Sequence, residues 1–403
     1  MVDMRPAMAP LTLMELPLEI RLLIYQAFLA EHQRIKQSRQ PSNAHIQVLR
    51  TCRQVYVEAG AIFRQYLSFR NEIEMERYCH LHSAADEIAA TVRWADVAND
   101  GRMVETMHSG ETGPASHLHL VLSKLPSLER LRVFNVRHYH PYSISVPHIR
   151  YHLDFEGAMF PAVCRLPDLR SYELHLDPTT RVVPFKAVPS AHIRILRLSG
   201  DCHLLVKAPL PNLLHLTLRG ITSNSFDQIP FNVCFPSCQL ESFTHVQGHR
   251  LGFELRNSHL ESLVTGPGSH LRKLVLLGSS RLTSSVIASC LRNLPTLEYL
   301  ALSLVTVNEL RDNFVLALGP SISVFKLQIT HAWYATPLFE EERRICNALE
   351  ERLLHPRSPL SAVFVSFHSR LMSEDGRQER WISIAEAAPL TLKIGPWEDD
   401  EET

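Results

Sequence analysis

Apolar and polar residues alternate in a short phrase that recurs along most of the chain. Its clearest copy is residues 210–218, LPNLLHLTL, in which the leucines follow the pattern L-x-x-L-x-L. A phrase of this kind, repeated every few tens of residues, predicts a stacked repeat architecture and not an active site. Related copies occupy residues 125–133, 166–174, 193–198, 271–276, 294–302 and 322–327.

The spacing between successive phrases narrows the class of repeat. Most spacings lie within or close to the ~20–29 residues of a leucine-rich repeat. The 41 residues between Leu128 and Leu169 leave room for an insertion, whereas the 11 between Leu260 and Leu271 are too few for a full unit. One of the phrases at Leu260 and Leu271 is therefore truncated, and the spacing leaves open which one.

Each full unit is expected to form a strand at x-L-x-L-x and a return segment, so that stacking builds a parallel sheet over a continuous leucine core. The predicted fold is α/β: a small N-terminal helical module followed by an irregular leucine-rich-repeat-like solenoid with a parallel sheet. Helices are predicted at residues 117–125, 282–294 and 340–354, and further strands at residues 69–75, 88–97, 362–367 and 381–384.

The N-terminal part of the chain has helical periodicity instead. Residues 11–30 predict an amphipathic helix with Pro17 in its opening position, where the missing N–H costs nothing. A polar, basic connection follows at residues 32–45, and residues 45–67 predict a helical pair with a break at Gly60. These pieces form a small helical module.

The same residues resemble a known motif. The phrase LPLEIRLLIYQAFL, followed by LRTCRQVYVEA, is similar to the F-box-like motif common in fungal proteins, and the match covers roughly residues 13–69. The resemblance implies that the helices dock on a SKP-type adaptor and place a substrate-binding domain in a cullin-RING ubiquitin ligase. The positions that it implies for adaptor contact are Leu16, Pro17, Ile20, Ile24, Leu49 and Val55.

The residues between the leucines of each strand are expected to line the concave face of the sheet. Basic residues outnumber the single acidic one, Glu173, although the chain as a whole is neutral. Arginine binds carboxylates and phosphates through paired hydrogen bonds, so this face suits an acidic or phosphorylated protein partner. The plainer alternative is a polar sheet surface on which arginine is a common choice. The predicted partner-binding residues are Arg130, Arg132, Arg197, His215, Arg219, Lys273 and Tyr299, on a face that also carries Phe134, Ser171, His175, Ile195, Ser199, Thr217, Val275, Ala301, Val324, Lys326 and Gln328.

Composition limits the possible partners and compartments. The chain of 403 residues has 41 Lys plus Arg against 42 Asp plus Glu, so no global field attracts nucleic acid or an anionic membrane. Its eight cysteines are scattered through apolar phrases, which is typical of reduced thiols. No apolar run is long enough for a membrane span or a signal peptide. The sequence therefore predicts a soluble protein of the cytoplasm or nucleus.

Residue types that carry chemistry are present but do not form a diagnostic pattern. Cys234 and Cys238 lack a second close pair, and the Cys79, His80, His82 cluster stands alone, so a zinc site is not expected. The histidine pairs 117/119 and 138/140 are interpreted as surface residues. Phosphate loops, dinucleotide fingerprints and nucleophile elbows are missing from the sequence. The expectation is therefore a protein without cofactor or metal that is not an enzyme.

These patterns divide the chain into four segments: a disordered leader at residues 1–10, the F-box-like module at 11–69, the repeat region at 70–390 and an acidic tail at 391–403. The expected function is that of a non-catalytic substrate receptor of an SCF-type ubiquitin ligase. The alternative is a free-standing interaction scaffold whose helices only cap the open end of the repeats. Exposure of the face formed by Leu16, Pro17, Ile20 and Ile24 distinguishes the two, because a cap buries it.

Overall fold

A computed structural model describes residues 12–34, 41–82, 87–99, 116–135, 156, 159–160, 166–176, 178, 180–204, 209–227, 229–247, 252–306, 310–334, 336–355, 358–388 and 390–398. The predicted leader lies outside the described residues. At the other end of the chain, the described part reaches Glu398.

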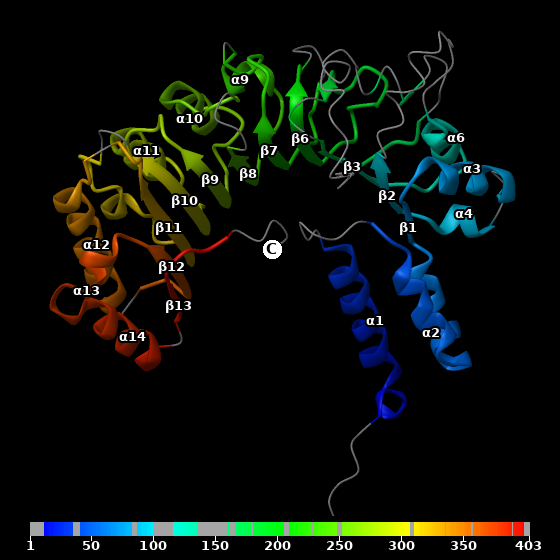
Figure 1. Cartoon of the computed structure of the whole chain (residues 1–403), viewed down its shortest axis with the longest axis horizontal. Coiled ribbons are helices and arrows are strands. Elements are labelled where there is room, and N and C mark those ends of the chain that lie inside the picture. The colour runs from blue at the N-terminus through cyan, green and yellow to red at the C-terminus, as the bar shows by residue number, and fades with distance from the viewer. Residues whose placement is uncertain are drawn as a thin grey trace, which may run out of the picture.

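The described chain is built on one parallel sheet of thirteen strands. Each strand pairs with the next in chain order, except that β4 pairs with β6, and β5 pairs only with β6. The sheet curves into an arc (Figure 1). The strands are β1 (Tyr66–Phe69), β2 (Trp94–Asn99), β3 (Arg130–Asn135), β4 (Ser171–His175), β5 (Arg181–Val182), β6 (Ile195–Cys202), β7 (His215–Ile221), β8 (Ser242–Val246), β9 (Lys273–Ser279), β10 (Tyr299–Thr306), β11 (Val324–His331), β12 (Ala362–Ser366) and β13 (Thr391–Ile394).

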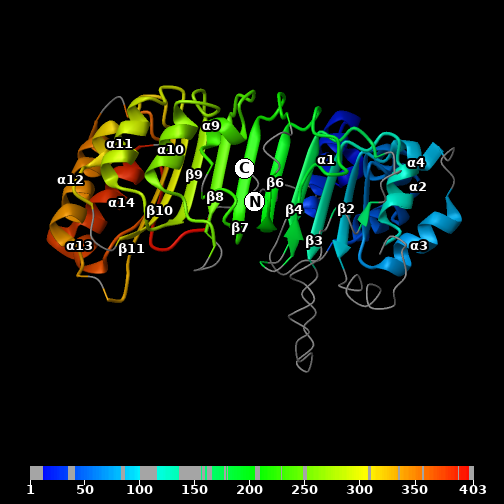
Figure 2. The same cartoon turned by 90° about the horizontal axis from the view of Figure 1, so that it is seen from above.

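Helices cover the outer side of this arc, while α1 lies at one end of its inner side (Figures 1 and 2). The α-helices are α1 (Leu18–Gln33), α2 (Arg53–Phe63), α3 (Glu72–Leu81), α4 (Glu87–Thr91), α6 (Leu118–Ser123), α9 (Phe231–Cys234), α10 (Asn257–Val264), α11 (Ser284–Arg292), α12 (Phe339–Leu354), α13 (Ser369–Ser373) and α14 (Arg377–Ala387). Short 3-10 helices are η1 (Leu13–Glu15), η2 (Ala44–Arg50), η3 (Phe314–Ala317) and η4 (Glu374–Gly376).

The alternating leucines of the recurrent phrase fill the space between sheet and outer helices. Leu216 and Leu218 of β7 are 1% and 0% exposed and belong to a core that runs from β1 to the last helices. Burying a leucine side chain stabilises the folded state by about 1.5–3 kcal/mol. The equivalent strand positions, Leu196 and Leu198, Leu274 and Leu276, and Leu300 and Leu302, lie in the same core. The predicted parallel α/β arrangement is therefore confirmed.

In β6, β7 and β9 a glycine lies two residues after the second leucine. Gly200 and Gly220 have φ angles of 78° and 60°, a region that side chains with a Cβ disfavour. The register between β6 and β7 shifts between Leu198 and Gly200. A β-bulge of this kind bends the strand end toward the next return segment.

The structure resolves the short spacing in the repeat. Leu260 lies in α10, 1% exposed, whereas residues 273–279 form β9. The phrase at Leu271 thus leads into a strand, and the phrase at Leu260 lies in the helix that connects β8 to β9. A short apolar run has the same composition in a buried helix as in a buried strand, so sequence spacing alone did not separate them.

Three of the predicted strands differ in the structure. Residues 69–75 span the end of β1 and the start of α3, because the Asn71 side chain accepts a hydrogen bond from the Glu74 amide at 3.0 Å and caps the helix. Residues 88–97 divide into the end of α4 and the start of β2. Residues 381–384 lie within α14, where Trp381 is buried and Ile382 is 42% exposed. The predictions at 362–367 and 340–354 agree with β12 and α12.

The N-terminal helices pack on one another through a small separate core. Tyr25 and Leu29 of α1 face Val55 and Phe63 of α2 in this core, which Tyr66 of β1 joins to the sheet. Pro17 directly precedes α1 in extended conformation. The predicted break at Gly60 is wrong, since Gly60 lies inside α2; the chain breaks instead before Cys52, whose sulfur accepts from the Val55 amide at 3.5 Å.

The first edge of the sheet is closed by a side chain. Asn43 lies beside β1, where its Nδ2 donates to the Ser68 carbonyl at 2.8 Å and its Oδ1 accepts from the Ser68 amide at 2.8 Å. An exposed strand edge is a site for unwanted pairing with other chains. Asn43 therefore satisfies both backbone groups of Ser68 that a further strand would use.

Candidate functional site

An apolar stripe on α1 is open to solvent. Ile20, Leu23, Ile24 and Phe28 are 44%, 59%, 38% and 45% exposed. Leu23 and Ile24 follow Ile20 by three and four residues, and Phe28 follows Ile24 by four, so all four lie on one side of the helix. The opposite side, which carries Tyr25 and Leu29, packs into the module. α1 thus has two apolar sides, of which only one is used within the described part of the chain.

The residues predicted for adaptor contact divide between these two environments. Pro17, Ile20 and Ile24 are exposed and Leu16 is half-buried beside them. Leu49 and Val55 are 6% and 3% exposed inside the helical core. Only the first four therefore lie on a surface that another protein reaches without opening the module.

Two polar contacts fix α1 against the rest of the module. Arg21 is paired with Glu58 of α2, with Nη2 and Oε1 2.6 Å apart, and also donates to the Leu16 carbonyl. The Arg21 hydrogen bond holds the pKa of Glu58 well below its usual value, at about 2. The loop before α1 and the exposed stripe are thereby held in one orientation.

The residues between the leucines line the inner face of the arc, as predicted. Their register places Asp96, Arg132, Glu173 and Arg197 side by side across β2, β3, β4 and β6. The row therefore alternates in charge. Asp96, at one end of the row, is missing from the sequence-based face because that face takes in only the leucine phrases, the first of which begins at residue 125.

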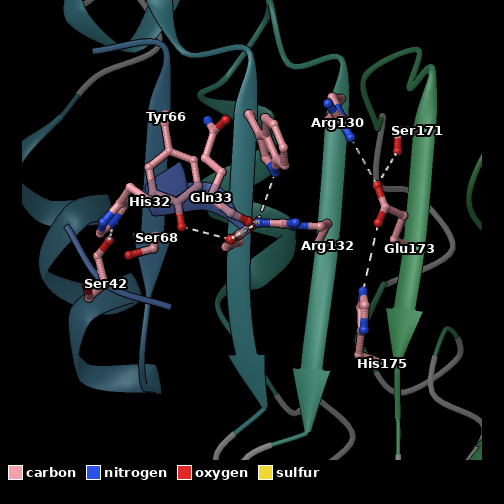
Figure 3. Close-up of polar contacts among 12 residues, drawn as sticks. His32, Gln33, Ser42, Tyr66, Ser68, Arg130, Arg132, Ser171, Glu173 and His175 are labelled. Atoms are coloured by element: carbon pink, nitrogen blue, oxygen red, sulfur yellow. Dashed lines mark hydrogen bonds and ion pairs between the residues drawn. The ribbon is translucent and has the colours of Figure 1, made fainter. Parts of the chain in front are cut away.

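Arg132 and Asp96 form the centre of a buried polar network (Figure 3). Arg132 donates from Nε and Nη2 to the two carboxylate oxygens of Asp96 at 2.8 and 2.7 Å. Tyr66 and Trp94 donate to the same carboxylate at 2.7 and 2.9 Å. Burial opposes the charge of Arg132, but Asp96 outweighs it, so the pKa of Arg132 is raised.

This network also anchors α1 to the sheet. Nη2 of Arg132 donates to the Gln33 carbonyl, at the last residue of α1, at 2.7 Å. A cation at a helix C-terminus is favoured by the helix dipole. Arg132, predicted to bind a partner, is instead engaged within the chain and 2% exposed.

Glu173 forms a second polar cluster on the next strand (Figure 3). It accepts from Ser171 at 2.7 Å and from Arg130 at 3.4 Å, and its Oε2 is 3.8 Å from Nε2 of His175. Burial by itself raises the pKa of Glu173, but the nearby His175 and Arg132 lower it by a larger amount, so this pKa lies below its usual value. Burial and the charge of Arg197 lower the pKa of His175 to about 3. Arg130 is thus also paired within the chain.

The remaining basic residues lie toward the middle and far half of the arc. Burial and repulsion from Arg197 lower the pKa of Arg219, while Glu398 opposes this shift. Burial lowers the pKa of His215. The Lys273 ammonium lies 4.8 Å from the ring centre of Tyr299. These positions, together with Arg197, remain the basic part of the inner face.

Part of this half is covered by a segment that the sequence-based prediction assigned to the acidic tail at residues 391–403. Trp397 is 6% exposed and packs with Val275 and Ala301 of the inner face in a cluster separate from the main core. Its indole N–H donates to the Leu327 carbonyl at 3.2 Å. In the sequence, the feature that could have indicated this contact was a tryptophan next to acidic residues.

The cysteines and histidines do not converge in the described part of the chain. No group of three or more His, Cys, Asp or Glu residues there is placed to hold a metal ion. Cys234 and Cys238 are buried, and burial raises the pKa of both thiols to about 11. These two cysteines are therefore protonated core residues at neutral pH.

Among the helices that the structure describes, none is long and apolar enough to span a bilayer. The chain matches no known protein-family profile and no curated protein. Functional argument therefore starts from the two surfaces, the open stripe of α1 and the inner face of the sheet.

Proposed function

We propose that the chain is a non-catalytic substrate receptor of an SCF-type ubiquitin ligase. In this proposal α1 and α2 form an F-box-like module that binds a SKP-type adaptor, and the parallel sheet is an irregular leucine-rich-repeat-like solenoid that binds the target. The observation that carries the proposal is the exposed apolar side of α1.

The exposure of that side is unfavourable for a helix without a partner. Contiguous apolar surface on a protein marks an interaction site, since each Å² left in water forgoes about 25 cal/mol of burial. Ile20 and Ile24 coincide with positions at which the resembled motif contacts its adaptor. Leu23 and Phe28 extend the same side of α1.

The anchoring of α1 suits a tethering mechanism. Arg132 holds the end of α1 at the inner face, so an adaptor on α1 is kept at a fixed distance from a target on the sheet. Fixed geometry raises the effective concentration of the target near the ligase without any chemistry by this chain. Arg197, Arg219 and Lys273 place positive charge at the inner face, which favours an acidic target.

Co-purification with a SKP-type adaptor tests the proposal. Ile20→Asp places a charge in the stripe and is expected to abolish adaptor capture while the thermal unfolding midpoint is retained. Ile382→Asp is the matched control, because Ile382 of α14 is 42% exposed at the other end of the sheet. Equal capture by both variants and the unmodified chain contradicts the proposal.

The scaffold alternative draws on the other side of the module. Tyr66 and Trp94 join the helical core to the first strands, so the helices also close the start of the sheet. This contact leaves Ile20 and Ile24 exposed, contrary to the expectation that a cap buries them, so a scaffold would use only the side of the module that faces the sheet. It therefore predicts that Ile20→Asp changes neither stability nor any binding activity.

A further inference from the structure

The chain reverses direction after its last strand and returns along the inner face (Figure 1). Gly395 has a φ angle of 120° and its amide donates to the Val365 carbonyl at 2.8 Å. This backbone conformation favours glycine, so the turn is specified by the Gly395-Pro396 sequence. The segment after this turn carries Trp397 over the sheet.

Trp397 packs on the inner face of the far half of the sheet. Val275, Ala301, Lys326 and Phe364 are register neighbours on β9, β10, β11 and β12. The indole packs with the two small side chains Val275 and Ala301, and Tyr299 and Phe364 pack against the same cluster. Elsewhere the row is polar or charged, so the apolar patch is local.

Lys326 adds a positive charge beside these aromatic rings. Its ammonium lies 5.2 Å from the ring centre of Tyr299, 5.0 Å from that of Phe364 and 5.8 Å from that of Trp397. A cation close to several aromatic faces is attracted to them, most strongly to tryptophan. The site therefore prefers tryptophan to an aliphatic side chain of similar size.

The positive charge around this aromatic cluster is complementary to the acidic residues that follow the tryptophan in the sequence. Glu398 is exposed and close enough to Arg219 of β7 to oppose the lowering of its pKa. Lys273 and Arg197 lie on the strands to either side of β7 and β8. The sequence from Glu398 onward is Glu-Asp-Asp-Glu-Glu-Thr. Glu398, the acidic residue directly after the tryptophan, thus lies close to the basic part of the inner face.

We propose that the inner face of β9–β12 is a binding site for a protein segment in which a tryptophan is followed by acidic residues, and that Trp397 and Glu398 occupy it within the chain. A target with such a segment displaces the chain's own. The inference deepens the proposed function, since it names the class of target, but its test involves no adaptor.

A labelled peptide of residues 395–403, GPWEDDEET, is the probe, and fluorescence anisotropy measures its binding to the full-length chain. Trp397→Ala empties the site and is expected to bind the probe at least about 10-fold more tightly than the unmodified chain, a difference of ~1.4 kcal/mol. A probe with alanine in place of its tryptophan is expected to lose at least as much affinity, because a buried aromatic anchor dominates such contacts.

Charge reversals separate this site from adhesion of an acidic peptide to any basic surface. In the Trp397→Ala chain, Arg219→Glu is expected to weaken binding of the probe several-fold. Arg292→Glu, at an exposed position of α11, is expected to leave the affinity for the probe unchanged. Equal affinities of the unmodified and Trp397→Ala chains, or binding that is indifferent to the tryptophan of the probe, overturn the proposal.

A second variant keeps the test decisive if Trp397→Ala fails to fold. Glu398→Arg retains the indole but repels Arg219, so it is expected to raise probe affinity by a smaller factor, and unchanged affinity overturns the proposal. Co-purification of the Glu398→Arg chain with the adaptor tests the role of α1 separately. If Ile20→Asp abolishes adaptor capture and Glu398→Arg does not, the receptor function is supported, whatever the affinity of the probe.

Discussion

Arg132 of β3 and Asp96 of β2 are joined by two charged hydrogen bonds of 2.8 and 2.7 Å and have side chains only 2% and 3% exposed. Desolvating two charges is costly, and the pair is stable because Tyr66, Trp94 and the Gln33 carbonyl supply the remaining hydrogen bonds. The pair thereby connects the end of α1, the edge of the sheet and the inner face.

Asp96→Ala is expected to lower the free energy of unfolding by about 3–5 kcal/mol, because it leaves the Arg132 charge buried without its partner. Urea unfolding followed by circular dichroism measures the loss. Glu298→Ala is the control, since its ion pair with Arg272 is exposed and contributes little. Similar losses in the two variants contradict a special role for the buried pair.

The stability of the chain is expected to fall as the pH is lowered from 7 to 5. Burial lowers the pKa of His245 to about 4, from an ordinary value of 6.5. Between these values the unfolded chain binds the proton and the folded chain does not, so the stabilisation present above pH 6.5 is lost toward pH 4. His175, whose pKa is lowered to about 3, adds to this trend.

The contribution of His245 is isolated by His245→Phe. Between pH 7 and pH 5, the two pKa values of this histidine lower the free energy of unfolding by about 2 kcal/mol. The variant should therefore lose about that much less stability than the unmodified chain across the same interval in paired urea titrations. An unchanged pH dependence shows that His245 is protonated equally in both states.

Leu216→Ala is expected to destabilise the chain by about 2–5 kcal/mol, because it leaves a cavity between the sheet and its outer helices. Thr217→Ala, one residue later, points to the inner face and should have a much smaller effect. Thermal unfolding of both variants checks the difference. Comparable losses at the two positions contradict the assignment of the two faces.

Asn43→Ala removes the side chain that closes the edge of β1. Loss of its hydrogen bonds to Ser68 is expected to cost about 1–3 kcal/mol and to increase hydrogen exchange at the Ser68 amide. It also leaves a strand edge open to pairing, so light scattering should detect association. Asn71→Ala, which removes the cap of α3, is the control. It should neither increase hydrogen exchange at the Ser68 amide nor cause association.

The sequence by itself determined the architecture of this protein. Leucines at x-L-x-L-x positions recur because each strand needs an apolar side against the outer helices, and this requirement is local enough to be visible in one phrase. Strong helical periodicity likewise located α1 and α12. The weaker predictions were wrong where a side chain decided the outcome, as Asn71 does at the start of α3.

Only the tertiary structure decided which residues of the inner face are available. Arg130 and Arg132 looked like free basic positions, but Glu173 and Asp96, distant in sequence, neutralise them. Trp397 was predicted to belong to an acidic tail, yet it packs with Val275 and Ala301 on the inner face. Such pairings depend on strand register and chain reversal, which bring together residues that no periodicity along the chain connects.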